Sequence, residues 1–539
     1  MLLETNMFAN IFLLALAIAT VPVSLLILAI GRRLSQYRAS RKSSQTRDYE
    51  DPPCENPYDL FGLLKMISAT RHVINKTAIA NSTELFQRHG ATYISTLFGA
   101  KVIFTCDPQN IKQVLVTRFI DYDASIVRAH LFRPITEHGI FAVDGPQWKV
   151  ARDMYRDQFS NTRAVFNLGV QEKGFQAFLK RIEGGGRQID LQPLFLNLTL
   201  DLTTAFAMGE SVDSLSPTQA EGKKRFVDSL QFVKKRMARD GFLGPVHVLL
   251  RQSDFHKACE KVKNYVEEFI QKALEKKRRS EKVTPSFEED STGYSLLEGL
   301  IENFDDPASI RDSVITILIA GIDSVAGLLS TTFWLLARHE NVWQRLRANT
   351  LELIGDEPPT YEQLRNFSYL RNVLNEAMRV CPPVPFNARV ANRDTVLLHG
   401  GGPSGTSPIH VRKGAKVVFS TWATHRSQAS FGENALDFRP ERWEGLKGEA
   451  LLGFVPFNSG PRVCPGRGWE EICGGGNPEV GYIGLMLAKE QYAIIEASYV
   501  VVRILQTFGK IRNCDERVWT EKLGLNLFNE HGVLVEFGN

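Results

Sequence analysis

The sequence lacks the cysteine spacing of a disulfide framework or a zinc site. Its seven cysteines stand at positions 54, 106, 259, 381, 464, 473 and 514, and they form no Cys-x-x-Cys pair and no Cys/His ligand pattern. This scatter favours free thiols in a reducing compartment. The chain also lacks an internal repeat and a Gly-rich dinucleotide-binding fingerprint. Its net charge of +4 is too small to indicate a nucleic acid partner.

Charge is also absent from one long run near the N-terminus, Phe8 to Ile30. About 20 apolar residues span a bilayer, and this run is longer than the apolar core of a signal peptide. Arginine and lysine are concentrated directly after it, up to Arg47. Under the positive-inside rule, the rest of the chain then lies in the cytosol. The sequence therefore predicts a single-pass anchor at 1–31, a basic and Pro-rich linker at 32–59, and one large domain at 60–539.

The large domain has an ordinary globular composition, with 43% hydrophobic and 23% charged residues in the whole chain. Its pattern predicts a mainly α fold with small β-sheets, the strands falling within Thr92–Phe104 and Val384–Phe419. The run Val314–Ala337 is apolar enough for a second membrane span. Asp323 lies midway along it, and an ionisable residue at a bilayer centre is unfavourable. We therefore expect a buried core helix there.

A single cysteine lies in a tight turn built from glycine and proline, Phe457-Asn-Ser-Gly-Pro-Arg-Val-Cys-Pro-Gly466. Glycine allows close backbone approach and proline stiffens the turn. A thiolate held in this way near Arg462 is a good axial ligand for haem iron. The alternative interpretation is a buried structural cysteine.

The spacing Phe-x-x-Gly-x-Arg-x-Cys-x-Gly resembles the haem-binding loop of the cytochrome P450 family. This resemblance implies the P450 fold and haem b as cofactor. It implies that Cys464 is the metal ligand and that Phe457, Arg462 and Gly466 surround the cofactor.

A second motif lies in the predicted core helix, at Ala320-Gly321-Ile322-Asp323-Ser324. It resembles the family's distal helix, and the resemblance implies that Gly321 leaves room for dioxygen while Asp323 and Ser324 relay protons. The family usually has threonine where this chain has Ser324, and serine loses the methyl group that restricts its rotamers. A Ser–Asp pair capping a helix kink is the competing interpretation.

Two further motifs complete the resemblance. Glu376 and Arg379 share a helix face, and Arg442 lies in a later Phe-Arg-Pro-Glu-Arg-Trp segment. Arg442 matches the third member of the family's structural ion network.

Trp148 and Arg152, four residues apart, match a pair that binds a haem propionate, and Arg389 and Arg462 match further propionate-binding positions. Without the other motifs, the Trp148 and Arg152 pattern fits a surface cation–π pair equally well.

One departure from the family lies after the cysteine loop. The family's next helix starts almost at once, whereas the matching segment here starts only at Gln491. The Gly-rich stretch 468–490 is therefore an unusual insertion. It is a genuine extra loop or, as we expect from its composition and abrupt borders, translated intron sequence.

The sequence predicts a membrane-anchored monooxygenase of the endoplasmic reticulum that uses O2, with its catalytic domain in the cytosol. Without a dinucleotide fingerprint of its own, the chain needs NADPH–cytochrome P450 reductase as a partner. A hairpin turn at Gly400–Gly405 resembles the fungal n-alkane and fatty-acid hydroxylase branch, which implies a hydrophobic small-molecule substrate. The alternatives are a tailoring oxidase of secondary metabolism, a haem isomerase or dehydratase, and a non-catalytic haem protein. The expected walls of the substrate pocket are residues 120–135, 232–250, 315–324 and 383–388.

Overall fold

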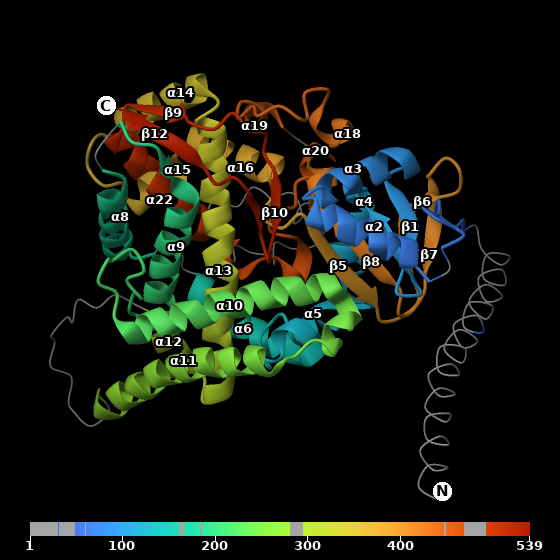
Figure 1. Ribbon diagram of the computed structural model, residues 1–539, viewed down its shortest axis with the longest axis horizontal. Coiled ribbons are helices and arrows are strands. Elements are labelled where there is room, and N and C mark those ends of the chain that lie inside the picture. Colours follow the sequence, from blue (N-terminus) through green and yellow to red (C-terminus); the bar gives the residue numbers. More distant parts are fainter. Residues whose placement is uncertain are drawn as a thin grey trace, which may run out of the picture.

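The structure, a computed structural model, describes residues 31, 49–59, 61–160, 166–183, 186–280, 295–446, 449–467 and 492–538. Helices dominate these residues, and four small sheets accompany them (Figure 1). This matches the predicted fold class of a mainly α protein with small β-sheets. The predicted anchor apart from Gly31, the linker up to residue 48 and the predicted insertion lie outside the described residues.

Helix α13 (Pro307–Leu336) runs through the middle of the molecule (Figure 1). Asp306 caps its first turn by accepting hydrogen bonds from the backbone N–H groups of Ala308 and Ser309, and proline occupies the first helical position. Among the described helices, α13 is long and apolar enough to cross a membrane, yet most of it is buried inside the protein. The prediction of a core helix is confirmed, and the helix begins seven residues earlier than its apolar run.

Helix α9 (Leu191–Met208) packs along α13. Its Asp190 N-cap accepts from the backbone N–H of Gln192, and most of the helix that follows is buried. The hydroxyl of Thr199 in α9 donates to the carbonyl of Ile322 in α13 at 3.0 Å, so the two buried helices also share a polar contact. This pair of helices forms the centre on which both cores are built.

The main core contains the second half of α13 and the first part of α9. Its other helices are α8 (Leu168–Ile182), α14 (Glu340–Leu353), α15 (Tyr361–Asn366), α16 (Ser368–Val380) and α22 (Tyr492–Thr507). A second core packs the first half of α13 against another group of helices. That group contains α5 (Ser125–Phe132), α6 (Gly145–Ser160), α10 (Glu221–Leu243), α11 (Ser253–Ser280) and α12 (Leu296–Asn303).

The largest sheet has five strands in the order β1-β2-β8-β5-β3. Their bounds are β1 (Thr92–Leu97), β2 (Ala100–Thr105), β8 (Lys416–Ser420), β5 (Phe386–Ala391) and β3 (Tyr122–Asp123). Only the β2–β8 pair is parallel among these pairings. The predicted strand regions are found here, and the predicted hairpin turn joins β6 (Thr395–Gly401) to β7 (Ser407–Val411).

Two sheets near the C-terminus were not predicted. One has the order β4-β12-β9, and the other is the hairpin β10-β11. Their strands are β4 (Ile189–Asp190), β9 (Lys510–Asn513), β10 (Glu521–Leu523), β11 (Leu527–Asn529) and β12 (Leu534–Gly538). These strands are five residues or shorter. A run of that length shows too little alternation of apolar and polar residues to be recognised from sequence.

The remaining elements connect the helices of the cores and the strands of the sheets. They are α2 (Leu63–Ile74), α3 (Ala78–His89), α4 (Pro108–Lys112), η1 (Gln113–Thr117), η2 (Phe119–Asp121), η3 (Gly244–Leu249), α17 (Thr421–Thr424), α18 (Gln428–Phe431), α19 (Arg442–Gly445), α20 (Glu449–Leu452), η4 (Gly460–Arg462) and η5 (Pro465–Arg467). The last two border the predicted cysteine ligand. Helix α2 and the turn η3 lie at the wall of the large cavity described below.

Candidate functional site

Cys464 lies in a tight loop between the 3₁₀ turns η4 and η5. Its backbone N–H donates to the carbonyl of Phe457 at 3.0 Å, and the N–H of Val463 donates to the carbonyl of Gly460 at 3.0 Å. Gly460 has φ +67°, and a Cβ at that position would overlap the carbonyl oxygen of Leu115. Glycine is therefore required there both for its backbone angle and for close packing on η1. The loop holds its cysteine in a fixed position.

The remaining predicted residues of this loop lie beside the cysteine. Phe457 is half-buried and packs against the main core. A Cβ on Gly466 would lie 3.8 Å from the sulfur of Cys464, which is ordinary contact. Turn η5 packs against α6 and α22, so the loop lies between two helices of different cores.

The predicted propionate-binding arginines gather at this loop from three elements. Arg152 comes from α6, Arg389 from β5 and Arg462 from η4. Burial lowers the pKa of Arg152 to about 10 and lowers that of Arg389 well below its ordinary value. The guanidinium of Arg462 stacks on the ring of Trp148, 4.4 Å from its centroid, and pairs with Asp144. The arginines are close enough to lower one another's pKa values.

A fourth arginine belongs to this cluster, and sequence reasoning did not assign it to the cofactor. It is Arg128 of α5. Burial, followed by the charge of Arg462, lowers the pKa of Arg128 to about 10. Its guanidinium also lies 5.2 Å from the centre of the Phe141 ring. No local spacing connects Arg128 to the other members, because α5 meets β5 only in the folded chain.

The arginine cluster fits a dianionic cofactor. Asp144 forms an ion pair with Arg462 and accepts from the backbone N–H groups of Ala124 and Ser125. Burial lowers the pKa values of Arg128, Arg389 and Arg462, and the negative charge of Asp144 offsets only part of this effect. Among the residues that the structure describes, the Nε atoms of Arg128 and Arg462 are buried and have no hydrogen-bond partner. Buried cations of this kind are unfavourable unless an anion pairs with them, and the two propionates of haem b have the required charge.

The predicted ion network is assembled as one buried cluster. Arg379 donates to both oxygens of Glu376 at 2.8 Å, and Arg442 Nε donates to Glu376 at 3.2 Å. Trp443 adds its indole N–H to the same carboxylate at 3.0 Å. Arg379 also donates to the backbone carbonyl of His425 at 2.9 Å. The cluster thus joins α16 to the segments that lead to the cysteine loop.

The two predicted proton-relay residues have other partners in the structure. Asp323 accepts from the ammonium group of Lys234 in α10 at 2.6 Å. Ser324 donates its hydroxyl to the carbonyl of Ala320, one turn back in α13, at 2.8 Å. A Cβ on Gly321 would lie 3.2 Å from the methyl group of Thr203 in α9. The structure therefore shows that α13 packs closely on α9 at this glycine.

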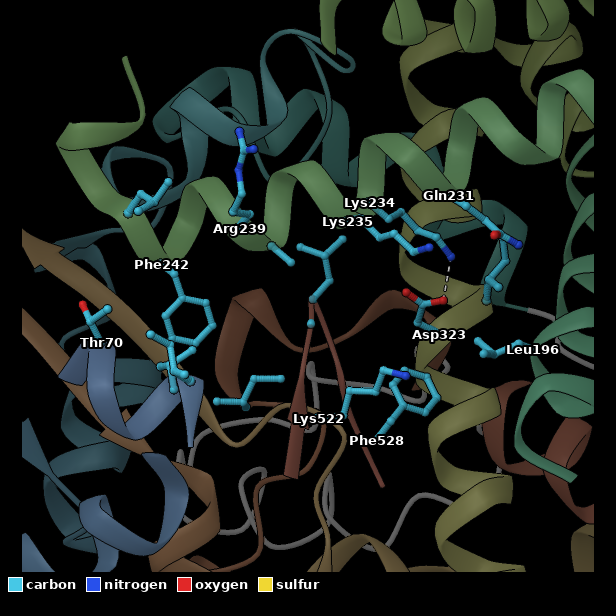
Figure 2. Close-up of a pocket in the computed structure, with 18 of the residues that line it drawn as sticks. Thr70, Leu196, Gln231, Lys234, Lys235, Arg239, Phe242, Asp323, Lys522 and Phe528 are labelled. Atoms are coloured by element: carbon cyan, nitrogen blue, oxygen red, sulfur yellow. Dashed lines mark hydrogen bonds and ion pairs between the residues drawn. The ribbon is translucent and has the colours of Figure 1, made fainter. Parts of the chain in front are cut away.

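A cavity of about 870 Å³ opens beside Asp323 (Figure 2). Its walls come from α2, α9, α10, α13 and the β10–β11 hairpin, and they are mainly apolar. Two of the expected wall regions contribute, namely 232–250 and the end of 315–324. Neither 120–135 nor 383–388 lines this cavity. The contributions of α2, α9 and residues 522–528 were not predicted, because these segments are far from the motifs in sequence.

Comparison with known proteins gives a consistent result. A model of the family described as cytochrome P450 matches residues 52–469. The match ends at the beginning of the predicted insertion.

Curated relatives cover most of the chain. The cytochrome P450 monooxygenase himC of Aspergillus japonicus is 38% identical over 452 residues, which is 84% of this chain and 76% of the relative. The cytochrome P450 monooxygenase fsdH of Fusarium heterosporum is 34% identical, covering 89% and 81%. Cytochrome P450 52A3-A of Candida maltosa is 34% identical, covering 89% and 91%. All three similarities extend well beyond the cysteine motif.

Proposed function

Because this chain belongs to the cytochrome P450 family and is a haem b-dependent monooxygenase, we propose that Cys464 is its iron ligand and that the arginine cluster binds the haem propionates. The observation that carries this proposal is the meeting of Arg128, Arg152, Arg389 and Arg462 beside the cysteine loop. When bound, haem with a thiolate ligand supplies iron that activates O2 for oxidation of a C–H bond.

The ligand is tested by Cys464→Ala. The reduced variant with carbon monoxide should lose the thiolate-type Soret band, because alanine cannot coordinate the iron. Cys473→Ala is the control and should retain the band. A band that persists in Cys464→Ala and disappears in Cys473→Ala would contradict the assignment.

The propionate assignment is tested by haem content. Arg128→Gln should reduce haem incorporation, because one buried cation of the cluster is lost while the side chain stays polar. Arg133→Gln is a matched control, since Arg133 follows the same helix and is exposed. Equal haem content in the two variants would contradict a role for Arg128 in cofactor binding.

We propose that Asp323 and Ser324 deliver protons to the oxygen site, as the family resemblance implies. Asp323 lies at the cavity and Ser324 is its neighbour on α13, so both groups are available once their present hydrogen bonds exchange. Ser324→Ala should increase the peroxide released per product formed. Unchanged coupling would indicate that Asp323 acts through water alone.

For the substrate, we propose a hydrophobic molecule, specifically a long-chain fatty acid or alkane. The mainly apolar walls of the cavity support this class, and so does the resemblance to the n-alkane and fatty-acid hydroxylase branch. A tailoring oxidase of secondary metabolism is the second candidate, because the same walls suit other apolar substrates. Microsomes that contain the protein should convert fatty acids or alkanes to hydroxylated products. Failure with every chain length would contradict the lipid assignment.

We propose that the protein is anchored in the endoplasmic reticulum membrane and receives electrons from NADPH–cytochrome P450 reductase. Exposed apolar side chains on α2 and η3 support membrane contact beside the cavity, among them Leu64, Ile67 and Leu249. Reconstitution with purified reductase should give NADPH-dependent reduction of the haem. Reduction that requires a different electron donor would contradict this partner.

A further inference from the structure

The large cavity carries an excess of positive charge on otherwise apolar walls. In the part of the chain that the structure describes, its charged lining residues are Lys234, Lys235, Arg239, Asp323 and Lys522. Four of these side chains are cations and one is a carboxylate. A cleft lined mainly by charges of one sign attracts ions of the opposite sign. The partners of each cation decide how much of this charge is available to a ligand.

Two of the cations are paired within the protein. Lys234 Nζ lies 2.6 Å from Asp323 Oδ1. Arg239 donates to Asp240 Oδ1 through Nη2 at 2.9 Å and through Nε at 3.1 Å. Figure 2 shows the Arg239 side chain directed away from the centre of the cavity. The charges of both residues are therefore already balanced.

Lys235 and Lys522 are the cations that remain. Among the described residues, neither ammonium group has a hydrogen bond or an ion pair. Lys235 belongs to α10 and Lys522 to β10, and in Figure 2 the helix lies above the cavity and the hairpin below it. Lys522 pairs in register with Phe528, so both side chains lie on the face of the hairpin that lines the cavity.

The two lysines and the apolar walls offer different kinds of contact to one ligand. Val73 of α2, Leu196 of α9 and Phe242 of α10 are among the apolar lining residues. Burial of hydrocarbon against such walls contributes about 25 cal/mol per Å². Lys235 and Lys522 are both exposed, and single ion pairs at exposed positions contribute at most about 1 kcal/mol. The walls thus provide affinity, and the lysines discriminate between charged and uncharged ligands.

We propose that Lys235 and Lys522 bind the carboxylate of the substrate, which is an apolar molecule with one anionic head group. Each ammonium group donates to a carboxylate oxygen, and the negative charge balances cations that the protein leaves unpaired. This inference rests on the proposed hydrophobic substrate and selects carboxylic acids over alkanes. Long-chain fatty acids and carboxylated precursors of secondary metabolites share this chemistry.

The first test is equilibrium dialysis of the holoprotein with dodecanoate and with its uncharged methyl ester. The wild type should bind dodecanoate about ten-fold more tightly than the ester, since only the acid engages the lysines. Lys235→Met and Lys522→Met should each weaken dodecanoate binding about three-fold and together about ten-fold. Ester binding should not change, because methionine keeps an apolar stem. The control is Lys224→Met, which removes an exposed lysine of α10 outside the cavity.

A second test reverses the charge. Lys235→Glu combined with Lys522→Glu should make the protein bind dodecyltrimethylammonium more tightly than dodecanoate. A purely structural role of the lysines would instead weaken binding of both ligands alike. Added salt should weaken binding of dodecanoate to the wild type and leave the ester unaffected, because ions screen exposed charges.

The lysine assignment and the proposed lipid substrate fail in different ways. Equal binding of acid and ester to the wild type, or wild-type dodecanoate binding in the double methionine variant, would overturn the lysine assignment alone. Lack of binding of dodecanoate, ester and dodecane would overturn the lipid substrate. Tighter binding of dodecanoate than of the polycyclic abietic acid supports a fatty acid as the ligand. The reverse order would overturn the lipid substrate and retain the two lysines as carboxylate ligands.

Discussion

At the scale of single residues, His425 shows how a buried titratable group limits stability. Its ring is fully buried, with Nδ1 3.3 Å from the carbonyl of Met378 and Nε2 accepting from the backbone N–H of Val455 at 2.9 Å. This pattern requires the neutral ring. Burial, together with the charges of Arg379 and Arg426, lowers the pKa of His425 to about 3.

This pKa predicts a defined dependence of stability on pH. An unfolded histidine titrates near pH 6.5, whereas the folded ring stays neutral down to about pH 3. The unfolded state therefore binds more protons as pH falls below 6.5, and stability decreases by up to ~1.4 kcal/mol per pH unit for this one group. Urea unfolding between pH 7 and 4.5 should show a shallower slope for His425→Gln than for the wild type. The exposed His256→Gln should keep the wild-type slope.

Gly460 gives a second prediction at this scale. Alanine at this position combines a positive φ with a Cβ that would overlap the carbonyl of Leu115, so we expect a loss of about 2 kcal/mol or more. The loop must shift, and haem content should fall with it. The control is Gly445→Ala, because that position has open space and no positive φ. Equal stability and haem content in the two variants would contradict the prediction.

At the scale of elements, the position of α22 bears on the predicted insertion. The helix begins at Tyr492, packs on α15 and α16, and contacts η5 beside the cysteine loop. The ring of Tyr492 lies among aromatic rings, with its centroid 4.8 Å from that of Phe206. Core packing therefore places the first turn of α22. The stretch 468–490 lies in sequence between η5 and α22, which are in contact with each other.

We accordingly predict that deletion of Gly468–Glu490 yields a protein that binds haem at least as well as the full chain. The entropy of loop closure changes slowly with length, so removing the stretch need not move α22. Haem content and the carbon monoxide spectrum are the measurements. A variant with a Gly/Ser segment of equal length separates the effect of length from that of sequence. Loss of haem on deletion alone, or retention of the stretch in every transcript, would show that it is a structural element.

At the scale of the whole molecule, the chain combines a predicted anchor with an apolar surface on the described domain. The exposed side chains of α2 and η3 flank the cavity, and Phe98 of the β1–β2 turn lies against Gly244 of η3. These segments come from different parts of the sequence and line one side of the cavity. A surface of this kind binds an interface through buried apolar area.

Removal of Met1–Ile30 should therefore release the protein from membranes only in part. Sedimentation with liposomes is the measurement. Adding Leu64→Ser, Ile67→Ser and Leu249→Ser to the truncated chain should release most of the remainder, because the apolar area is lost. Full release by truncation alone would show that the anchor is the only attachment.

The sequence by itself identified the family and predicted most of the candidate site. The cysteine loop, the distal-helix motif, the ion network and the Trp148–Arg152 pair each depend on residues close together in sequence, so spacing alone reveals them. The core position of α13 was also predictable, because Asp323 argued against a membrane span and the helix is mostly buried.

Only the tertiary structure decided which distant residues meet. Arg128 joins the arginine cluster, and Lys234 reaches Asp323 across 89 positions of sequence. The short C-terminal strands pair with segments far away, as Leu534 does with Asp190. Local spacing carries no information about such contacts, because they arise when packed helices and sheets bring remote side chains together. The sequence therefore indicated the chemistry of this protein, and the packing of α10 on α13 determined which residue pairs with the Asp323 carboxylate.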